Sequence, residues 1–231
     1  MKRSEINALM RDAWDFFDRY SFRLPSWASW SPADWGRADA AAGEVVRHHL
    51  GWDITDFGSG DFKRCGLLLF TIRNGKLGDP AAPKPYAEKI MIVREEQLTP
   101  MHFHFHKMED IINRGGGRLV IELWNSDSDE STANTPIEVS IDGVVTRVEP
   151  GGRVALSPGQ SITLPPRLYH AFWGEPGAGT VLVGEVSSVN DDATDNRFLE
   201  PVGRFPDIEE DEPPLHLLCN EYPAALVGGR S

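Results

Sequence analysis

Hydrophobic and polar positions follow two periodicities along the chain, and the first of these is helical. The first 50 residues read as helical, with a loop rich in Trp, Pro and Ser after the opening stretch, where apolar side chains recur at helical spacing. In the opening stretch these are Ile6, Leu9, Met10, Trp14 and Phe17. Ser4 stands where a helix cap is expected, and Ser31 followed by Pro32 indicates the start of a second helix. The pattern therefore predicts a helical N-terminal region.

From about Cys65 the pattern changes to short β-type runs separated by turn residues. They include "GLLLFTIRNGK", "EKIMIVREEQLTP", "RLVIELW" and "GTVLVGEVSSV". Asp142 and Gly143 stand between alternating apolar residues, which is typical of a β-hairpin. Many short strands with Gly and Pro turns predict a sandwich or small barrel. We expect one structural domain, with a helical extension over 1–60, the barrel over 61–200 and an acidic, proline-rich tail over 201–231.

Composition narrows the classes of partner. The 231 residues carry a formal net charge of -12, which argues against nucleic acid or an anionic membrane as partner. No run of 18 apolar residues and no leader-like opening is found. Cys65 and Cys219 lie far apart without metal-type spacing, so two free thiols are expected. We expect a soluble cytoplasmic protein that acts on a small molecule.

The segment "TPMHFHFHKMED", residues 99–110, carries three histidines at alternate positions and then a glutamate. On a continuous strand, His102, His104 and His106 share one face. Four residues separate His104 from Glu109, enough for a turn that returns the glutamate on the next strand. Only two separate His106 from Glu109. This spacing favours His102 and His104 as a pair, with His106 as a residue that orients a ligand or the substrate.

A third histidine, His170, lies in "GQSITLPPRLYHAFWG", where Gly159 and Pro165 bracket a predicted strand. Three neutral imidazoles and one carboxylate form a mixed nitrogen and oxygen shell. Such a shell suits Mn²⁺, Fe²⁺, Co²⁺, Ni²⁺ or Zn²⁺ and leaves positions open for substrate oxygens, as in a catalytic site. The alternative is that these histidines are polar residues on an exposed strand face.

The two segments resemble the paired motifs of the cupin superfamily. The first motif, His-x-His followed by Glu and Gly, is matched by His102, His104, Glu109 and Gly116. The second is matched by Gly159, Pro165 and His170, whereas Arg167 stands in place of a glycine, which we expect to alter the turn. The resemblance implies a mainly β fold, the cupin double-stranded β-helix or jelly-roll barrel. It also implies a metal held by His102, His104, Glu109 and His170.

More of the chain resembles the bacterial D-lyxose isomerases. The similar segments are "MKRSEIN", "HFHFHKMEDIINRGGG" and "EVSSVNDDATDNRF". The resemblance implies a divalent metal, typically Mn²⁺, and interconversion of D-lyxose with D-xylulose and of D-mannose with D-fructose. By analogy with cupins it also implies a homodimer.

Such an isomerase needs a base beside the metal that is not itself a ligand. Glu185, in the otherwise apolar run "TVLVGEVSS", is the candidate base, since burial would raise its pKa and the metal would lower it. The alternative is a salt-bridged barrel residue. Lys107 directly follows the histidines, where a cation would stabilise an enediolate or move a proton between oxygens. The alternative is a solvated turn lysine.

Further polar residues are candidates for holding the sugar through paired hydrogen bonds. They are Lys89, His106, Asp192, Asp195 and Arg197. An ordinary surface turn would have the same composition as "VNDDATDNRF". Trp124, Trp173 and Phe172 are expected either to wall the pocket or to belong to the core. His48, His49 and His216 lack comparable context and are interpreted as structural or surface residues.

Other functions remain compatible with these residues. Three His and one Glu also serve Fe²⁺ in cupin dioxygenases, which consume O₂. A sugar-binding or regulatory cupin would keep the barrel without turnover, although an intact ligand set argues against it. A cupin-type phosphoglucose isomerase would need a cationic grip on phosphate, which the net charge of -12 disfavours.

Overall fold

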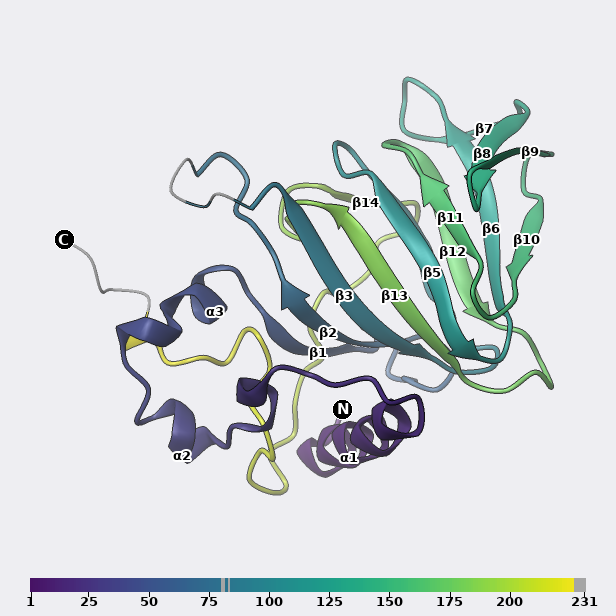
Figure 1. Cartoon of the computed structure of the whole chain (residues 1–231). Helices are drawn as coiled ribbons and strands as arrows, with labels where there is room; N and C mark the ends of the chain where they lie inside the picture. Colours follow the sequence, from purple (N-terminus) through teal and green to yellow (C-terminus); the bar gives the residue numbers. More distant parts are fainter. Residues whose placement is uncertain (80–81, 83, 227–231) are drawn as a thin grey trace.

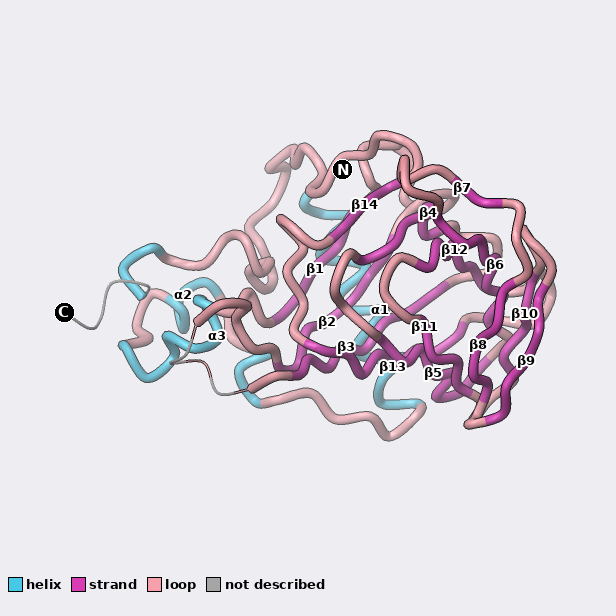
Figure 2. Tube along the Cα trace, turned by 90° about the horizontal axis from the view of Figure 1, so that it is seen from above, coloured by secondary structure: helices cyan, strands magenta, loops and turns pink. Residues whose placement is uncertain are grey.

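Two antiparallel sheets face each other and enclose the interior of a barrel (Figure 2). The computed structural model describes residues 1–79, 82 and 84–226. The larger sheet has the strand order β1-β2-β3-β13-β5-β11-β8-β9. The smaller has the order β10-β6-β12-β4-β14, with β7 paired to β6. This curled, mainly β arrangement is the jelly-roll barrel expected from the sequence.

The larger sheet is built from eight strands of the described chain. They are β1 (Gly51–Thr55), β2 (Leu67–Arg73), β3 (Tyr86–Val93), β5 (Glu109–Gly116), β8 (Ile137–Ile141), β9 (Val144–Val148), β11 (Ser161–Leu164) and β13 (Val181–Ser188). The smaller sheet contains β4 (Thr99–His104), β6 (Leu119–Ser126), β7 (Thr132–Ala133), β10 (Arg153–Leu156), β12 (Leu168–Gly174) and β14 (Asn196–Phe198). β8 and β9 form the predicted hairpin, in which Asp142 and Gly143 both have positive φ, as a two-residue turn requires.

Helices cover one face of the larger sheet near its β1 edge (Figure 1). They are α1 (Arg3–Arg19), α2 (Pro32–Trp35) and α3 (Gly43–Arg47), with short 3-10 turns at Ser26–Ser29, Ala40–Ala42 and Ala224–Leu226. Ser31 caps α2 as predicted, and its side chain accepts from the backbone N–H of Asp34. Strand β1 begins inside the segment 1–60 that was expected to be a helical extension, so the sheet starts earlier than the sequence pattern suggested.

The strands of the larger sheet near α1 are buried on both faces. In β2, Leu69 points into the barrel core, whereas Phe70 joins the cluster that packs against α1. The same division separates Met91 from Ile90 and Ile92 in β3. Burial on both faces explains why these strands read as continuous apolar runs instead of alternating ones.

The acidic segment after residue 200 is packed against α1. Arg3 is 1% exposed, and its guanidinium donates to the carboxylates of Glu210 and Glu221. Ser4 lies inside the helix, which has no side-chain cap, and it binds Asp211 instead. The prediction that Ser4 caps the helix was therefore wrong. The ion pair between Arg3 and Glu221 therefore joins the N-terminal helix to the C-terminal segment.

The sequence predicted two free thiols. Cys65 and Cys219 are both free thiols. Within the described part of the chain, every helix is too short or too polar to cross a membrane.

Candidate metal centre and active site

Strands β4, β5 and β12 bring four candidate ligands together inside the barrel. His102 and His104 alternate on β4, and His102 lies opposite His170 of the antiparallel strand β12. The turn over residues 105–108 crosses from the smaller sheet to the larger one, where β5 begins at Glu109. The Glu109 side chain therefore faces the histidines across the barrel. This is the geometry that the four-residue spacing predicted.

The four side chains converge within metal-binding distance of one another. The candidate ligand atoms of His102, His104 and His170 all lie within 4.8 Å of one another. Glu109 Oε1 lies 3.0 Å from His170 Nε2 and 3.4 Å from His104 Nε2. All four residues are buried.

Hydrogen bonds to backbone carbonyls determine which ring nitrogen is free. Nδ1 of His102 lies 2.8 Å from the carbonyl oxygen of Pro100, and Nδ1 of His170 lies 3.0 Å from that of Leu168. A carbonyl oxygen only accepts, so we assign the proton to Nδ1 in both rings. Nε2 of each ring then presents a lone pair to the interior of the barrel.

The charge states of these residues suit a cation. Burial lowers the pKa of His102 well below its usual range, and the neighbouring His170 and His104 add to the effect. Burial also lowers the pKa of His104, helped by Lys107. For Glu109, burial acts to raise the pKa, but Lys107 and His104 outweigh it and the net pKa is well below the usual range. At neutral pH His102 and His104 are therefore uncharged, and Glu109 is an ionised carboxylate.

A metal ion fits this arrangement on physical grounds. Glu109 Oε1 and His170 Nε2 are buried and have no hydrogen-bond donor among the described residues. Two acceptor atoms facing each other at 3.0 Å repel unless a proton or cation lies between them. Three imidazole nitrogens and one carboxylate oxygen are the mixed donor set that binds Mn²⁺, Fe²⁺, Co²⁺, Ni²⁺ or Zn²⁺.

Beside these ligands lies a buried row of alternating charges. Lys107 Nζ is 2.7 Å from Glu109 Oε2 and 2.9 Å from Glu185 Oε1. Lys89, which pairs with Glu185 across strands β3 and β13, places its Nζ 3.4 Å from the same Oε1. The row therefore runs Glu109, Lys107, Glu185, Lys89, and its charges balance.

Ion pairing determines the protonation states of Glu185 and Lys107 in this row. Burial alone would raise the pKa of Glu185, but Lys107 and Lys89 lower it to below its usual value. Burial acts in the opposite direction on Lys107, yet Glu109 and Glu185 raise its pKa above the usual value. Glu185 is thus an ionised carboxylate held next to the ligands without belonging to them, and Lys107 is a buried ammonium, not a solvated turn lysine.

The remaining sequence candidates occupy different positions. Both carboxylate oxygens of Asp195 accept backbone N–H groups of the turn, from His106 at 2.8 Å and from Lys107 at 3.0 Å. The structure directs Arg197 away from the cavity, because its Nε donates to Glu130 at 2.8 Å. The side chain of His106 is exposed, and its residue lies beyond the end of β4.

Of the three aromatic candidates, only Phe172 lines the cavity, and Trp124 and Trp173 lie outside it. Phe172 lines the same cavity as the four candidate metal ligands. Trp173 instead packs under the guanidinium of Arg153, and Trp124 is half-buried beside Glu122.

Arg167, which stands in place of the cupin glycine, has a left-handed backbone conformation. Its φ is 64°, a left-handed conformation that glycine adopts most easily. Its backbone N–H donates to the carbonyl of His104 at 2.8 Å. Its guanidinium lies over the rings of Phe103 and Phe105. Arg167 thus adopts a conformation that favours glycine, and its guanidinium packs on two aromatic rings. An altered turn stays a prediction.

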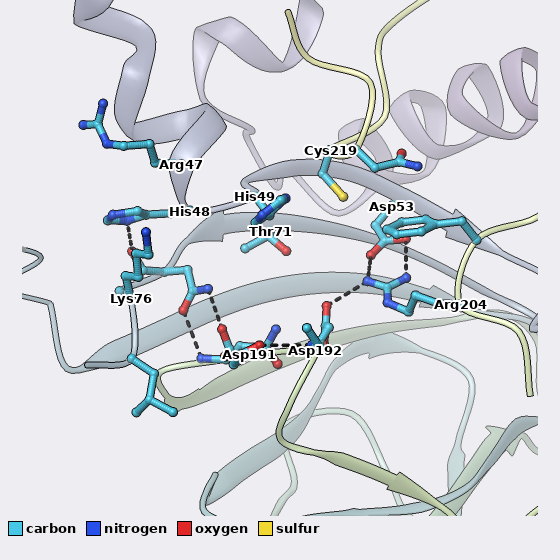
Figure 3. A pocket seen from close by; sticks show the side chains of 17 residues that line it. Arg47, His48, His49, Asp53, Thr71, Lys76, Asp191, Asp192, Arg204 and Cys219 are labelled. Atoms are coloured by element: carbon cyan, nitrogen blue, oxygen red, sulfur yellow. Dashed lines mark hydrogen bonds and ion pairs between the residues drawn. The ribbon is translucent and has the colours of Figure 1, made fainter. Parts of the chain in front are cut away.

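Sequence reasoning missed two charged residues that line this cavity, Asp53 and Arg204. Arg204 Nη1 donates to Asp53 Oδ1 at 3.1 Å, and its Nη2 donates to Asp192 at 2.7 Å (Figure 3). Asp192, a sequence candidate, has a lowered pKa: burial opposes the shift, but Lys89 and Arg204 outweigh it. The sequence signal that could have identified Asp53 is a carboxylate within the strand "GWDIT", which is buried. No sequence pattern pointed to Arg204.

The cavity around these groups has a volume of about 70 Å³. Two buried polar atoms of residues that line it, Thr99 Oγ1 and Asn196 Oδ1, lack a hydrogen-bond partner among the described residues. Unpartnered buried polar atoms are costly unless a ligand or water binds them. The cavity thus combines a metal-type donor set, an ionised carboxylate and free hydrogen-bonding atoms.

Comparison with known proteins identifies the family. The sequence model of the D-lyxose isomerase family matches residues 1–222. A D-lyxose/D-mannose isomerase of Escherichia coli O157:H7 is 56% identical over 96% of this chain and 98% of its own length. One from Serratia proteamaculans is 53% identical over the same shares.

Solved structures agree on the fold. The L-ribose isomerase of Cellulomonas parahominis with L-ribose has a TM-score of 0.60 and 17% identity, covering 90% of this chain and 98% of its own. A mutant L-ribose isomerase of an Acinetobacter strain, in complex with L-ribose, has a TM-score of 0.59 and 16% identity over the same shares.

The fold and the buried site define a cupin with a histidine and glutamate cluster at the centre of its barrel. The chain belongs to the D-lyxose isomerase family, and it is an enzyme that interconverts an aldose and a ketose sugar.

Proposed function

We propose that this enzyme interconverts D-lyxose with D-xylulose, and D-mannose with D-fructose, at the metal-type site inside the barrel. The observation that supports this most strongly is the ionised Glu185, buried beside, but not among, the three converging histidines and Glu109. The names of the relatives at 56% and 53% identity support the choice of sugars.

His102, His104, Glu109 and His170 would hold the metal. A bound divalent ion, typically Mn²⁺, supplies Lewis-acid polarisation of the sugar oxygens at C1 and C2. Nδ1 of His102 and His170 donates to a backbone carbonyl, which fixes each ring with its Nε2 lone pair facing the centre. Co²⁺, Fe²⁺, Ni²⁺ and Zn²⁺ suit the same donor set.

Glu185 would act as the base that takes the proton from one carbon and returns it to the other. It is ionised at neutral pH because of Lys107 and Lys89, so it is ready to accept a proton. Lys107 supplies a fixed positive charge where an enediolate develops negative charge. The barrel excludes water from this transfer, since Glu185 and Lys107 are both buried.

Lys89 and Asp192 line the cavity and would contact sugar hydroxyls, together with Thr99 and Asn196. We propose a supporting role for Asp195, which holds the turn that carries Lys107. Contacts of His106 and Arg197 with the sugar, a homodimeric assembly and a cytoplasmic location stay predictions.

The test is an anaerobic incubation of metal-stripped enzyme with and without Mn²⁺, on D-lyxose, D-mannose and D-glucose 6-phosphate, followed by ketose detection. We expect D-xylulose and D-fructose to form only when metal is present. Ketose from the phosphosugar alone would contradict the proposed substrates. Absence of any ketose, together with O₂ uptake in air, would instead indicate a dioxygenase.

A further inference from the structure

A second cavity adjoins the metal-type site on the side of α3. Its volume is about 360 Å³, several times that of the first. Asp53, Asp192 and Arg204 line both cavities, and Arg204 forms ion pairs with the two carboxylates (Figure 3). We call these shared ion pairs the Arg204 partition. The proposed metal ligands and the proposed base line the first cavity and not the second.

The second cavity lies close to the reacting groups. Asn190, which lines it, accepts hydrogen bonds at its Oδ1 from Lys89 at 2.8 Å and from Lys107 at 3.3 Å. Lys107 Nζ in turn is 2.7 Å from Glu109 Oε2. Asn190 Oδ1 is therefore no more than about 6 Å from a candidate metal ligand. With carbon–carbon bonds of about 1.5 Å, an extended chain of six carbons is also about 6 Å long.

The first cavity is small for a whole sugar. Its volume is about 70 Å³, and one water-sized group needs about 10–15 Å³. The carbons that react must lie beside the metal ligands and Glu185. The far end of an open-chain sugar then extends from these groups toward the residues shared by the two cavities and toward Asn190.

The groups at and beyond the partition suit neutral hydroxyls. The partition offers donors from Arg204 and acceptors from Asp53 and Asp192. Beyond it, Asn74 and Asn190 exchange two hydrogen bonds, Asn74 Nδ2 to the carbonyl of Asn190 at 2.9 Å and Asn190 N–H to Asn74 Oδ1 at 3.0 Å. This pair holds the wall of the second cavity in a fixed position.

Charges in the second cavity do not favour an anionic group. Arg47, Lys76 and Arg204 are opposed by three carboxylates, those of Asp53, Asp191 and Asp192. A phosphate would need a clear excess of positive charge, as an arginine or lysine cluster provides.

We infer that the second cavity is the subsite for the distal end of the open-chain sugar, and that it sets how long a substrate the enzyme accepts. A pentose ends at the Arg204 partition, whereas the sixth carbon of a hexose lies beyond it. This inference rests on the proposed function. It gives one active site the means to accept both D-lyxose and D-mannose.

Two separate substitutions, each on a different wall, test this inference by narrowing the second cavity while its charged residues stay unchanged. Ala193→Phe adds bulk from the loop after β13, and Thr71→Ile adds it from β2 with a residue that suits a strand. Ala33→Phe is the control, because Ala33 is an exposed alanine of α2 outside both cavities. For each variant, kcat/KM is measured with D-lyxose and D-mannose, and folding is checked by thermal unfolding.

We expect each cavity variant to lower kcat/KM for D-mannose at least about tenfold more than for D-lyxose, the scale on which enzymes discriminate one added carbon. The Ala33→Phe ratio should equal that of the wild type. Folded variants that leave the ratio unchanged, or lower both values equally, would overturn the inference. So would faster turnover of D-mannose 6-phosphate than of D-mannose. A wild-type enzyme inactive on both sugars would instead refute the proposed function.

Discussion

Lys107 and Glu185 lie 78 residues apart in the chain and meet in the barrel interior with Nζ and Oε1 2.9 Å apart. The same ammonium lies 2.7 Å from Glu109 Oε2. One buried cation thus joins the carboxylate proposed as a metal ligand to the carboxylate proposed as the base. Its charge keeps both ionised, although burial opposes this. The base and the metal site are therefore electrostatically coupled.

Glu185→Gln should abolish most turnover while the metal stays bound. The amide keeps the shape of the side chain but cannot accept the proton, and general-base catalysis contributes about 10²–10⁴-fold. We expect kcat to fall within that range with metal content unchanged, measured by ketose assay and elemental analysis. Glu138→Gln is the control, because Glu138 is an exposed residue of strand β8. A Glu185→Gln enzyme with near wild-type kcat would place the base elsewhere.

Asp195→Ala should lower kcat more than it changes KM. Asp195 acts through Lys107, since its carboxylate accepts the backbone N–H groups of His106 and Lys107. Leaving these donors unpaired costs about 1–3 kcal/mol each where they are buried, so the free energy of unfolding should also fall. Urea unfolding and steady-state kinetics measure the two effects. Asp129→Ala, in an exposed loop, should change neither. An increase in KM alone would indicate direct contact with the sugar.

The free energy of unfolding should fall as the pH drops below 6.5, in part because of His216. Burial lowers the pKa of His216 from its usual 6.5, against a hydrogen bond to the carbonyl of Trp30. Below pH 6.5 the unfolded chain therefore binds a proton that the folded protein resists, and stability present above that pH is lost.

His216→Gln removes this contribution. Urea unfolding of metal-stripped protein at about pH 7.5 and about pH 5.5 should give a smaller loss of stability for the variant than for the wild type. His102 and His104 contribute equally to both proteins, so the comparison isolates His216. An identical loss in the two proteins would show that His216 titrates normally in the folded state.

The sequence predicted the site best where local geometry determines it. The alternation of His102 and His104 on a strand, with four residues before Glu109, requires only strand periodicity and a turn. His106 differs because β4 ends at His104, so the alternation does not continue to it.

Contacts between distant segments were beyond the sequence pattern. Arg204 reaches Asp53 from 151 residues away, and such a pairing leaves no periodic signal. Asp195 and Arg197 stand in a polar stretch whose composition does not reveal which side chains face the cavity; one binds backbone N–H groups and the other binds Glu130. The acidic tail after residue 200 gave no sign of its contacts, because its partner Arg3 lies about 200 residues away in the sequence.

A single metal ion at His102, His104, Glu109 and His170 is the central feature of the proposed mechanism, and parallel titration tests it most directly. Metal-stripped wild type, His102→Ala and His106→Ala are titrated with Mn²⁺, and bound metal and the rate of D-lyxose isomerisation are measured on the same samples. We predict that metal and rate rise together in the wild type and saturate at one ion per chain. His102→Ala should lose both, and His106→Ala should keep its metal. Full activity without metal, or metal lost from His106→Ala but kept by His102→Ala, would contradict the account.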